Sequence, residues 1–219
     1  MTVPVIIESK GGPLAGDLTI PDQPVGIVVF AHGSGSSRHS TRNRAVAETL
    51  QGSNFATLLL DLLTEAEDQV DIRTRQLRFD IALLADRVRT AVAQIREHAA
   101  VRGLPLGLFG ASTGAAAALV AAAHDSSIRA VVSRGGRPDL AGAALHRVQA
   151  PTLLIVGSRD ERVLDLNRQA VLQLTALNRI EVVQGATHLF EEPGTLAEVA
   201  RLAAGWLRDH VPDRRTTSG

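Results

Sequence analysis

The stretch Gly110-Ala111-Ser112-Thr113-Gly114 decides our interpretation of the fold. It has the pattern G-x-S-x-G, and it lies between a short apolar run at 104–109 and an alanine-rich run at 115–124. In such a strand–turn–helix context a serine is held on a tight turn with its hydroxyl exposed. The glycines let the backbone turn sharply and let the helix approach the strand closely. We therefore predict that Ser112 is a nucleophile in a strained, positive-φ conformation, the alternative being an ordinary tight turn.

Eight segments around this motif have the pattern of β-strands. The first two are separated by Gly11-Gly12-Pro13, which indicates a hairpin. Most of the later segments are continuous apolar runs, which are typical of parallel strands buried on both faces. The predicted strands are 3–8, 14–20, 25–31, 55–61, 105–109, 128–133, 151–156 and 180–183.

Helical patterns alternate with these strands, which favours an α/β sheet with helices on both faces. The longest pattern, 74–98, carries one apolar stripe at steps of three and four residues. The other predicted helices are 42–50, 115–124, 163–177 and 196–207. The acidic segment 62–73 has no such stripe and is either a flap over a site or a solvated loop. We expect a single domain at 1–211 and a polar, disordered tail at 212–219.

Composition excludes several classes of function. The 219 residues suit one globular domain, and 45% of them are hydrophobic. The 23 basic residues balance the 23 acidic ones, so neither a nucleic acid nor a membrane is an expected partner. The chain has no cysteine, which excludes a thiolate nucleophile. No signal peptide or membrane span is evident, so we expect a cytoplasmic protein, and an oligomer is possible but not indicated.

Two further residues complete a candidate catalytic set. A serine hydroxyl needs a histidine as its base, and the histidine needs an acid to fix its tautomer. Asp160 and His188 follow later strands in the order that this chemistry requires, and parallel strands end at one rim. The alternatives are that Asp160 only caps the next helix, with Glu161 or Asp165 as the acid, and that His188 is a packed surface residue.

The glycine-rich loop His32-Gly33-Ser34-Gly35 follows the third strand and is predicted to hold an oxyanion. Backbone N–H groups stabilise the charge that acyl transfer builds on a carbonyl oxygen. We expect the N–H groups of Ser34 and Thr113 to supply this oxyanion hole, whereas His32 is expected to be structural. The lysine and the spacing of a phosphate-binding P-loop are absent here.

Two arginines are weaker candidates for substrate binding. Arg38 follows the glycine-rich loop, and Arg134 follows the strand at 128–133, so both reach the same rim. Arg134 can clamp a substrate carboxylate, or it can pair with Asp139 or another acid of the loop and hold that loop. The seven histidines show no paired helical spacing, and we expect no metal and no cofactor.

Together these motifs resemble the α/β-hydrolase fold, and within it the dienelactone hydrolase-like group. The resemblance covers about 5–207 and is carried by His32-Gly33-Ser34-Gly35, by Gly110-Ala111-Ser112-Thr113-Gly114, by Gly157-Ser158-Arg159-Asp160 and by Gly185-Ala186-Thr187-His188. It implies an eight-stranded, mostly parallel sheet with an antiparallel second strand and the order 1-2-4-3-5-6-7-8. True dienelactone hydrolases use a cysteine where this chain has Ser112. The connection at 134–150 is too short for the helical lid of larger members, so the site is expected to be shallow and open.

The expected function is a serine hydrolase that cleaves a small carboxylic ester or thioester through an acyl-enzyme. Ser112, His188 and Asp160 are its expected catalytic residues. The alternatives are a non-catalytic ligand-binding protein on the same fold, and an acyltransferase or amidase that uses the same residues.

Overall fold

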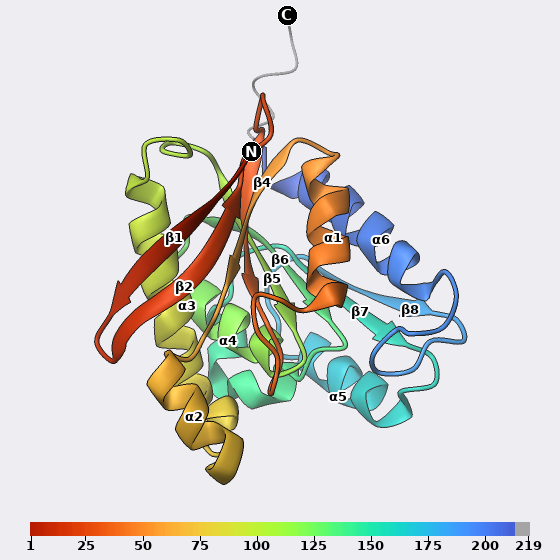
Figure 1. Ribbon diagram of the computed structural model, residues 1–219. Coiled ribbons are helices and arrows are strands. Elements are labelled where there is room, and N and C mark those ends of the chain that lie inside the picture. The colour runs from red at the N-terminus through yellow and green to blue at the C-terminus, as the bar shows by residue number, and fades with distance from the viewer. Residues whose placement is uncertain (213–219) are drawn as a thin grey trace, which may run out of the picture.

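The computed structural model describes residues 1–212 and contains one eight-stranded sheet in the order β1-β2-β4-β3-β5-β6-β7-β8 (Figure 1). The predicted tail therefore lies outside the described residues, apart from Pro212. The strands are β1 Thr2–Ser9, β2 Gly12–Thr19, β3 Gly26–Ala31, β4 Phe55–Leu60, β5 Leu106–Ala111, β6 Ile128–Arg134, β7 Thr152–Gly157 and β8 Asn178–Val183. All eight predicted strands are present, and the predicted strand order is confirmed.

The first two strands form the predicted hairpin. Ser9 lies opposite Gly12, whose φ of 120° is one that side chains rarely adopt. β2 is antiparallel to both of its neighbours, β1 and β4. All neighbouring pairs among the strands β3 to β8 are parallel. Every residue of β3, β4, β5 and β7 is buried, which is the physical reason why these segments are apolar without alternation.

Helices cover both faces of the sheet, as Figure 1 shows. The helices α1 Thr41–Gln51 and α6 Thr195–His210 bury Val46, Leu50, Val199 and Leu207 in one cluster on one face. The helices α3 Ile81–Glu97 and α4 Thr113–Ala122 pack on the other face, with α5 Glu161–Val171 beside β7 and β8. No helix among residues 1–212 is long and apolar enough to cross a membrane.

One segment that was not predicted as a helix is helical, and the boundaries of two predicted helices were wrong. Segment 62–73 is neither an irregular flap nor a loop, because Thr64 and Glu67 form a capping box that starts helix α2, Glu65–Thr74. The long helix begins at Ile81, because Arg75 is left-handed and the Asp80 carboxylate accepts a hydrogen bond from the Leu83 N–H at 3.0 Å. Helix α5 ends at Val171, six residues before the predicted end.

The two remaining elements are short 3₁₀ segments, η1 Leu77–Phe79 and η2 Pro138–Arg147. The second forms the middle of the connection between β6 and β7. A long helical insertion is therefore absent at this place, as the short connection predicts.

Candidate active site

Ser112 lies on the sharp turn between β5 and α4, with φ 51° and ψ −121°. This confirms the predicted positive φ, which is costly for a residue with a side chain. Gly110 and Gly114 on either side must be glycine, because other backbone segments lie too close to leave room for a Cβ. A Cβ at Gly110 would lie 2.4 Å from the Cα of Ala115, and a Cβ at Gly114 would lie 2.3 Å from the carbonyl oxygen of Ala31.

His188 and Asp160 are in direct contact, with 2.6 Å between Nδ1 and Oδ2. Asp160 stands at the N-cap position of α5, but its side chain makes no capping hydrogen bond. The rival acid Asp165 pairs with Arg168 at 3.0 Å instead. The side chain of His188 is 38% exposed and that of Asp160 is 14% exposed, so the acid is shielded while the imidazole is open to solvent. The hydrogen bond assigns the proton to Nδ1 and leaves Nε2 as an acceptor.

Gly135 contacts His188 and follows a residue that is hydrogen-bonded to the Ser112 turn. The N–H of Ser112 donates to the carbonyl oxygen of Arg134 at 3.2 Å, which joins the turn to the residue before Gly135. A Cβ at Gly135 would lie 3.6 Å from Cε1 of His188 and 3.1 Å from the His188 carbonyl oxygen. The positive φ of 50° at Gly135 also suits glycine. The three candidate catalytic residues are thus brought to one rim of the sheet.

The glycine-rich loop contacts the Ser112 turn. A Cβ at Gly33 would lie 3.0 Å from the Cβ of Ser112. Ser34 and Thr113 both line a pocket of about 1320 Å³. Within residues 1–212 neither of their backbone N–H groups donates a hydrogen bond, so both donors are available to a ligand.

His32 is buried and has a structural role, as expected. Its Nδ1 lies 2.9 Å from the carbonyl oxygen of Gly33, and its Nε2 accepts the Leu62 N–H at 3.0 Å. Burial lowers the pKa of His32 below its ordinary value of 6.5, although the hydrogen bond to Gly33 acts in the opposite direction. The neutral ring joins the glycine-rich loop to the end of β4.

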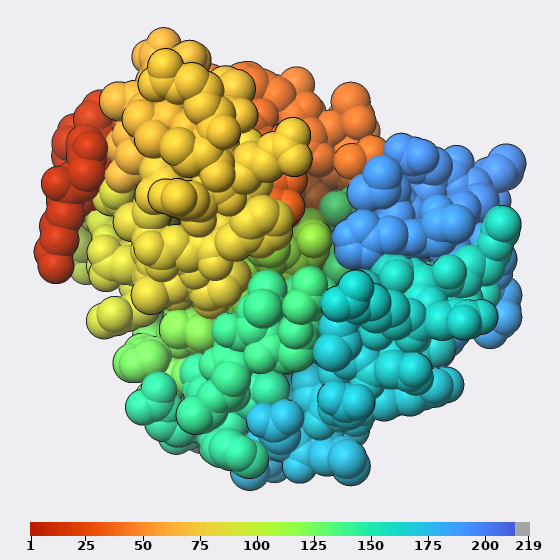
Figure 2. All heavy atoms as spheres, turned by 90° about the horizontal axis from the view of Figure 1, so that it is seen from below, coloured from red at the N-terminus to blue at the C-terminus, as the bar shows by residue number. Residues whose placement is uncertain are grey.

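The pocket lies between the loop 33–40, the segment 61–64 and helix α2. Figure 2 shows this end of the molecule, where the yellow atoms of α2 lie close to orange atoms of earlier segments. Glu65, Asp68 and Ile72 are among the α2 residues at its wall. Helix α2 therefore forms one side of the pocket, next to the residues predicted to hold the oxyanion.

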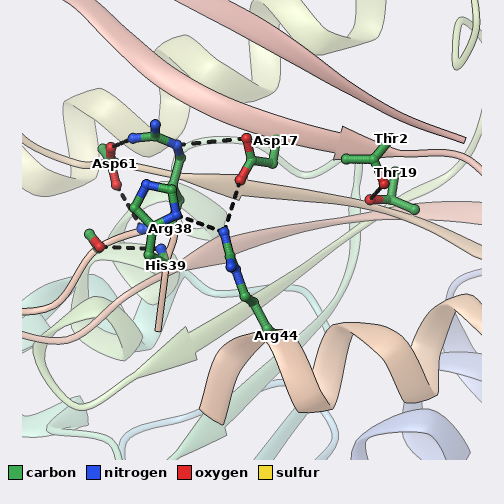
Figure 3. Close-up of polar contacts among 8 residues, drawn as sticks. Thr2, Asp17, Thr19, Arg38, His39, Arg44 and Asp61 are labelled. Atoms are coloured by element: carbon green, nitrogen blue, oxygen red, sulfur yellow. Dashed lines mark hydrogen bonds and ion pairs between the residues drawn. The ribbon is translucent and has the colours of Figure 1, made fainter. Parts of the chain in front are cut away.

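Arg38 borders the pocket but is already paired with two carboxylates. Its guanidinium bonds to Asp61 and lies 3.7 Å from Oδ1 of Asp17, and its backbone N–H donates to Asp61 at 2.6 Å (Figure 3). Arg44 from α1 reaches the other oxygen of Asp17 at 3.5 Å. These contacts favour a role in holding the glycine-rich loop, and substrate binding by Arg38 stays a prediction.

Arg134 is buried at the end of β6, with 8% of its surface exposed. Asp139 is not its partner, because that carboxylate pairs with Arg137 at 2.7 Å. Burial, together with the nearby Arg42 guanidinium, lowers the pKa of Arg134 to about 10. Its Nη1 has no hydrogen-bond partner within the described chain.

Sequence reasoning missed two residues that support this site. Asp61 holds the loop that carries Ser34, and its signal is only a carboxylate at the end of a predicted strand. Gly157 allows the His188 loop to approach, because a Cβ there would lie 2.3 Å from the carbonyl oxygen of Ala186. The glycine was visible in the motif before Asp160, but the close approach depends on the neighbouring strand.

Comparisons with known proteins identify relatives for this fold. Residues 24–198 match the model of the alpha/beta hydrolase domain. A dienelactone hydrolase from Anabaena variabilis is 51% identical, with a TM-score of 0.94 over 96% of this chain and 98% of that one. The esterase domain of a Rhodothermus marinus protein is 19% identical, with a TM-score of 0.76 over 96% of this chain and 99% of that one, which shows the fold alone.

A curated relative from Mycobacterium tuberculosis, provisionally named a phosphoribosyl transferase, is 59% identical over 200 residues. The match covers 91% of this chain but only 44% of that protein. The chain thus spans less than half the length of this relative.

Proposed function

The chain belongs to the alpha/beta hydrolase domain family, and from this premise we propose that it cleaves a small carboxylic ester or thioester with a serine nucleophile. The observation that carries the proposal is the 2.6 Å contact of Asp160 with His188, on the same rim of the sheet as the positive-φ turn at Ser112. The similarity to a dienelactone hydrolase supports a hydrolase. The resemblance described above implies that Ser112 stands where that group has a cysteine nucleophile.

In the first half of the proposed reaction, Ser112 Oγ attacks the carbonyl carbon while Nε2 of His188 takes its proton. Asp160 stabilises the imidazolium and keeps the proton of Nδ1 in place. The C–O or C–S bond of the leaving group then breaks, and His188 protonates that group as it departs. The acyl group remains on Ser112 as an ester.

In the second half, His188 removes a proton from water, and the water oxygen attacks the acyl carbon. The bond to Ser112 breaks, Oγ recovers its proton from His188, and the carboxylic acid leaves. The N–H groups of Ser34 and Thr113 are proposed to hold the oxyanion in both halves. Their free N–H groups and their position at the pocket wall support this role.

A fluorophosphonate probe tests the proposal without knowledge of the substrate, because it labels only an activated serine. We expect one adduct on Ser112, mapped by peptide mass spectrometry, and loss of the adduct in His188→Ala. The variant Ser112→Ala is expected to lose nearly all turnover of simple esters and thioesters while its melting temperature is retained. Ser127→Ala is the control, since this residue is exposed and bonds to Asp125. Undiminished turnover in Ser112→Ala would refute the proposal.

A further inference from the structure

Arg134 is a buried cation without a counter-ion. No ion pair or side-chain hydrogen bond is made by Arg134 within residues 1–212, and its Nη1 is fully buried without a partner. Burying an unpaired charge is costly, and buried charges are ordinarily paired. A partner from outside the described chain would remove that cost.

The side chain of Arg134 lies on the α1 and α6 face of the sheet. Side chains alternate along a strand, so Arg134 shares this face with Ala130 and Val132, which belong to the cluster buried by α1 and α6. Its backbone carbonyl meanwhile accepts the N–H of Ser112 at 3.2 Å. The unpaired guanidinium therefore belongs to the residue that supports the proposed nucleophile.

A second cation stands beside it. Arg42 reaches Glu191 in the loop that follows His188, and the His188 carbonyl oxygen would lie 3.1 Å from a Cβ on the residue after Arg134. The Nε of Arg42 is also buried without a hydrogen bond, and its charge contributes to the lowered pKa of Arg134. The Nη1 of Arg42 lies 3.2 Å from Glu191, but the side chain of Glu191 is 64% exposed, so solvent screens this pair. Asp160 is occupied by His188 at 2.6 Å. Neither carboxylate neutralises the two buried guanidinium nitrogens.

The start of α1 adds to the positive potential. Arg42 is the second residue of this helix, whose first turn contains no acidic residue. The N-terminal end of a helix carries a partial positive charge and favours anions. Two orphaned guanidinium nitrogens and a helix N-terminus thus occur together.

We propose that Arg134 and Arg42 form a binding site for a small anion, a carboxylate or a halide, next to the Ser112 turn. A carboxylate can accept two parallel hydrogen bonds from a guanidinium, and it would supply the missing partner of Nη1. The anion has two sources, a carboxylate on the substrate or a free ion. The first source rests on the proposed function, whereas the second does not.

Chloride alone is the first probe, measured by the line width of its NMR signal in solutions of the purified protein. We expect protein-dependent broadening that acetate reverses, and that falls several-fold in Arg134→Gln and in Arg42→Gln. Arg44→Gln is the matched control, since it removes a charge from the same helix, where Arg44 pairs with Asp17. The side chain of Arg42 is more exposed than that of Arg134, so Arg42→Gln is expected to fold. If Arg134→Gln fails to fold, chloride broadening in Arg42→Gln still tests the site.

A matched pair of esters distinguishes the two sources. The half-ester of glutarate with para-nitrophenol carries a carboxylate, and the pentanoate ester of the same alcohol does not. If the substrate supplies the anion, Arg134→Gln lowers the kcat/KM of the glutarate ester relative to the pentanoate ester by about tenfold. Because both esters are measured with the same variant, the ratio of their kcat/KM values is unaffected by a general loss of activity.

The outcomes separate cleanly. Loss of chloride broadening with an unchanged ester ratio assigns the site to a free anion, and a fall in the ratio assigns it to the substrate. Chloride broadening that is absent or unchanged in the variants, together with an unchanged ratio, overturns the proposal. If the wild-type protein hydrolyses neither ester, the proposed function fails in this assay, and the chloride measurement alone decides the anion site.

Discussion

At the scale of single residues, the position of Asp160 allows two roles, that of a helix cap and that of the acid for His188. An aspartate at the N-cap position of a helix ordinarily accepts a hydrogen bond from a backbone N–H of the first turn. Here the Asp160 carboxylate bonds to Nδ1 of His188 at 2.6 Å and makes no capping bond. The first turn of α5 therefore lacks a capping hydrogen bond from Asp160, and the carboxylate is oriented towards His188 instead of the helix.

Asp160→Asn tests this interpretation. An amide in place of the carboxylate favours the wrong tautomer of His188, so we expect kcat to fall by about 10⁴-fold, as such substitutions do in serine hydrolases with this arrangement. The melting temperature is expected to stay close to that of the wild type. The control is Asp165→Asn, which removes an exposed carboxylate from the same helix and is expected to leave kcat unchanged. A similar kcat for both variants would contradict the role of Asp160.

Gly114 tests the close approach of α4 to β3. A Cβ there would meet the carbonyl oxygen of Ala31 at 2.3 Å, and backbone cannot move aside cheaply. We expect Gly114→Ala to lower the free energy of unfolding by about 3 kcal/mol. The same change at Gly205 in α6 meets nothing within 4 Å and is expected to raise it by about 1 kcal/mol. Urea unfolding of both variants measures the contrast, and equal effects would refute the packing argument.

At the scale of elements, helix α2 is fixed to its neighbours. Glu67 closes the capping box with Thr64 and also pairs with Arg87 of α3 at 2.6 Å. Arg87 is buried and also bonds to Ser9 at the end of β1. These contacts hold the N-terminal end of α2, and hence one wall of the pocket, against α3 and the first hairpin.

Arg87→Met is therefore expected to loosen α2. Removing one partner of a buried pair is costly, but Glu67 keeps 22% of its side chain exposed, so we expect a loss of only about 2 kcal/mol. Hydrogen exchange at 65–70 is expected to accelerate more than exchange in β5. Arg89→Met, an exposed change on the same helix, is the control. Unchanged exchange in α2 would show that other contacts hold this wall.

At the scale of the whole molecule, the sheet order places every candidate residue on one rim. β3, β5 and β7 are parallel, so the segments that follow them, with Ser34, Ser112 and Asp160, emerge at the same end. β8 is parallel to β7 and delivers His188 to that end too. The site is assembled by strand order and not by local sequence.

The stability of the whole fold is expected to depend on pH through His32. Its pKa is lowered in the folded state, so the unfolded chain binds a proton more readily below pH 6.5. The free energy of unfolding is therefore expected to fall as pH decreases from 6.5 towards the folded pKa, by up to about 1.4 kcal/mol per pH unit. Above pH 6.5 this contribution is constant.

Urea unfolding between pH 5 and 8 measures this slope, with NMR titration of the His32 ring as a direct check. We expect the slope to decrease in His32→Gln and to persist in His124→Gln, since His124 is exposed. An identical slope in both variants would assign the pH dependence to other groups.

Much of the fold could be predicted from the sequence, because apolar patterning reports burial directly. The apolar runs predict all eight strands, and the G-x-S-x-G motif predicts the strained serine, whose φ is 51°. Helix α2 was missed because it carries no apolar stripe. Its signal was nonetheless present, since Thr64 followed by Glu67 has the pattern of a capping box.

The sequence by itself determined the alternation of strands and helices and the residues able to carry the chemistry, because both depend on local pattern. Only the tertiary structure decided their partners: His188 for Asp160, Asp61 for Arg38, and none within the described chain for Arg134. These contacts join residues far apart in the chain or depend on which face of a strand a side chain takes. Local sequence cannot specify them, because the order of the strands in the sheet sets the distances.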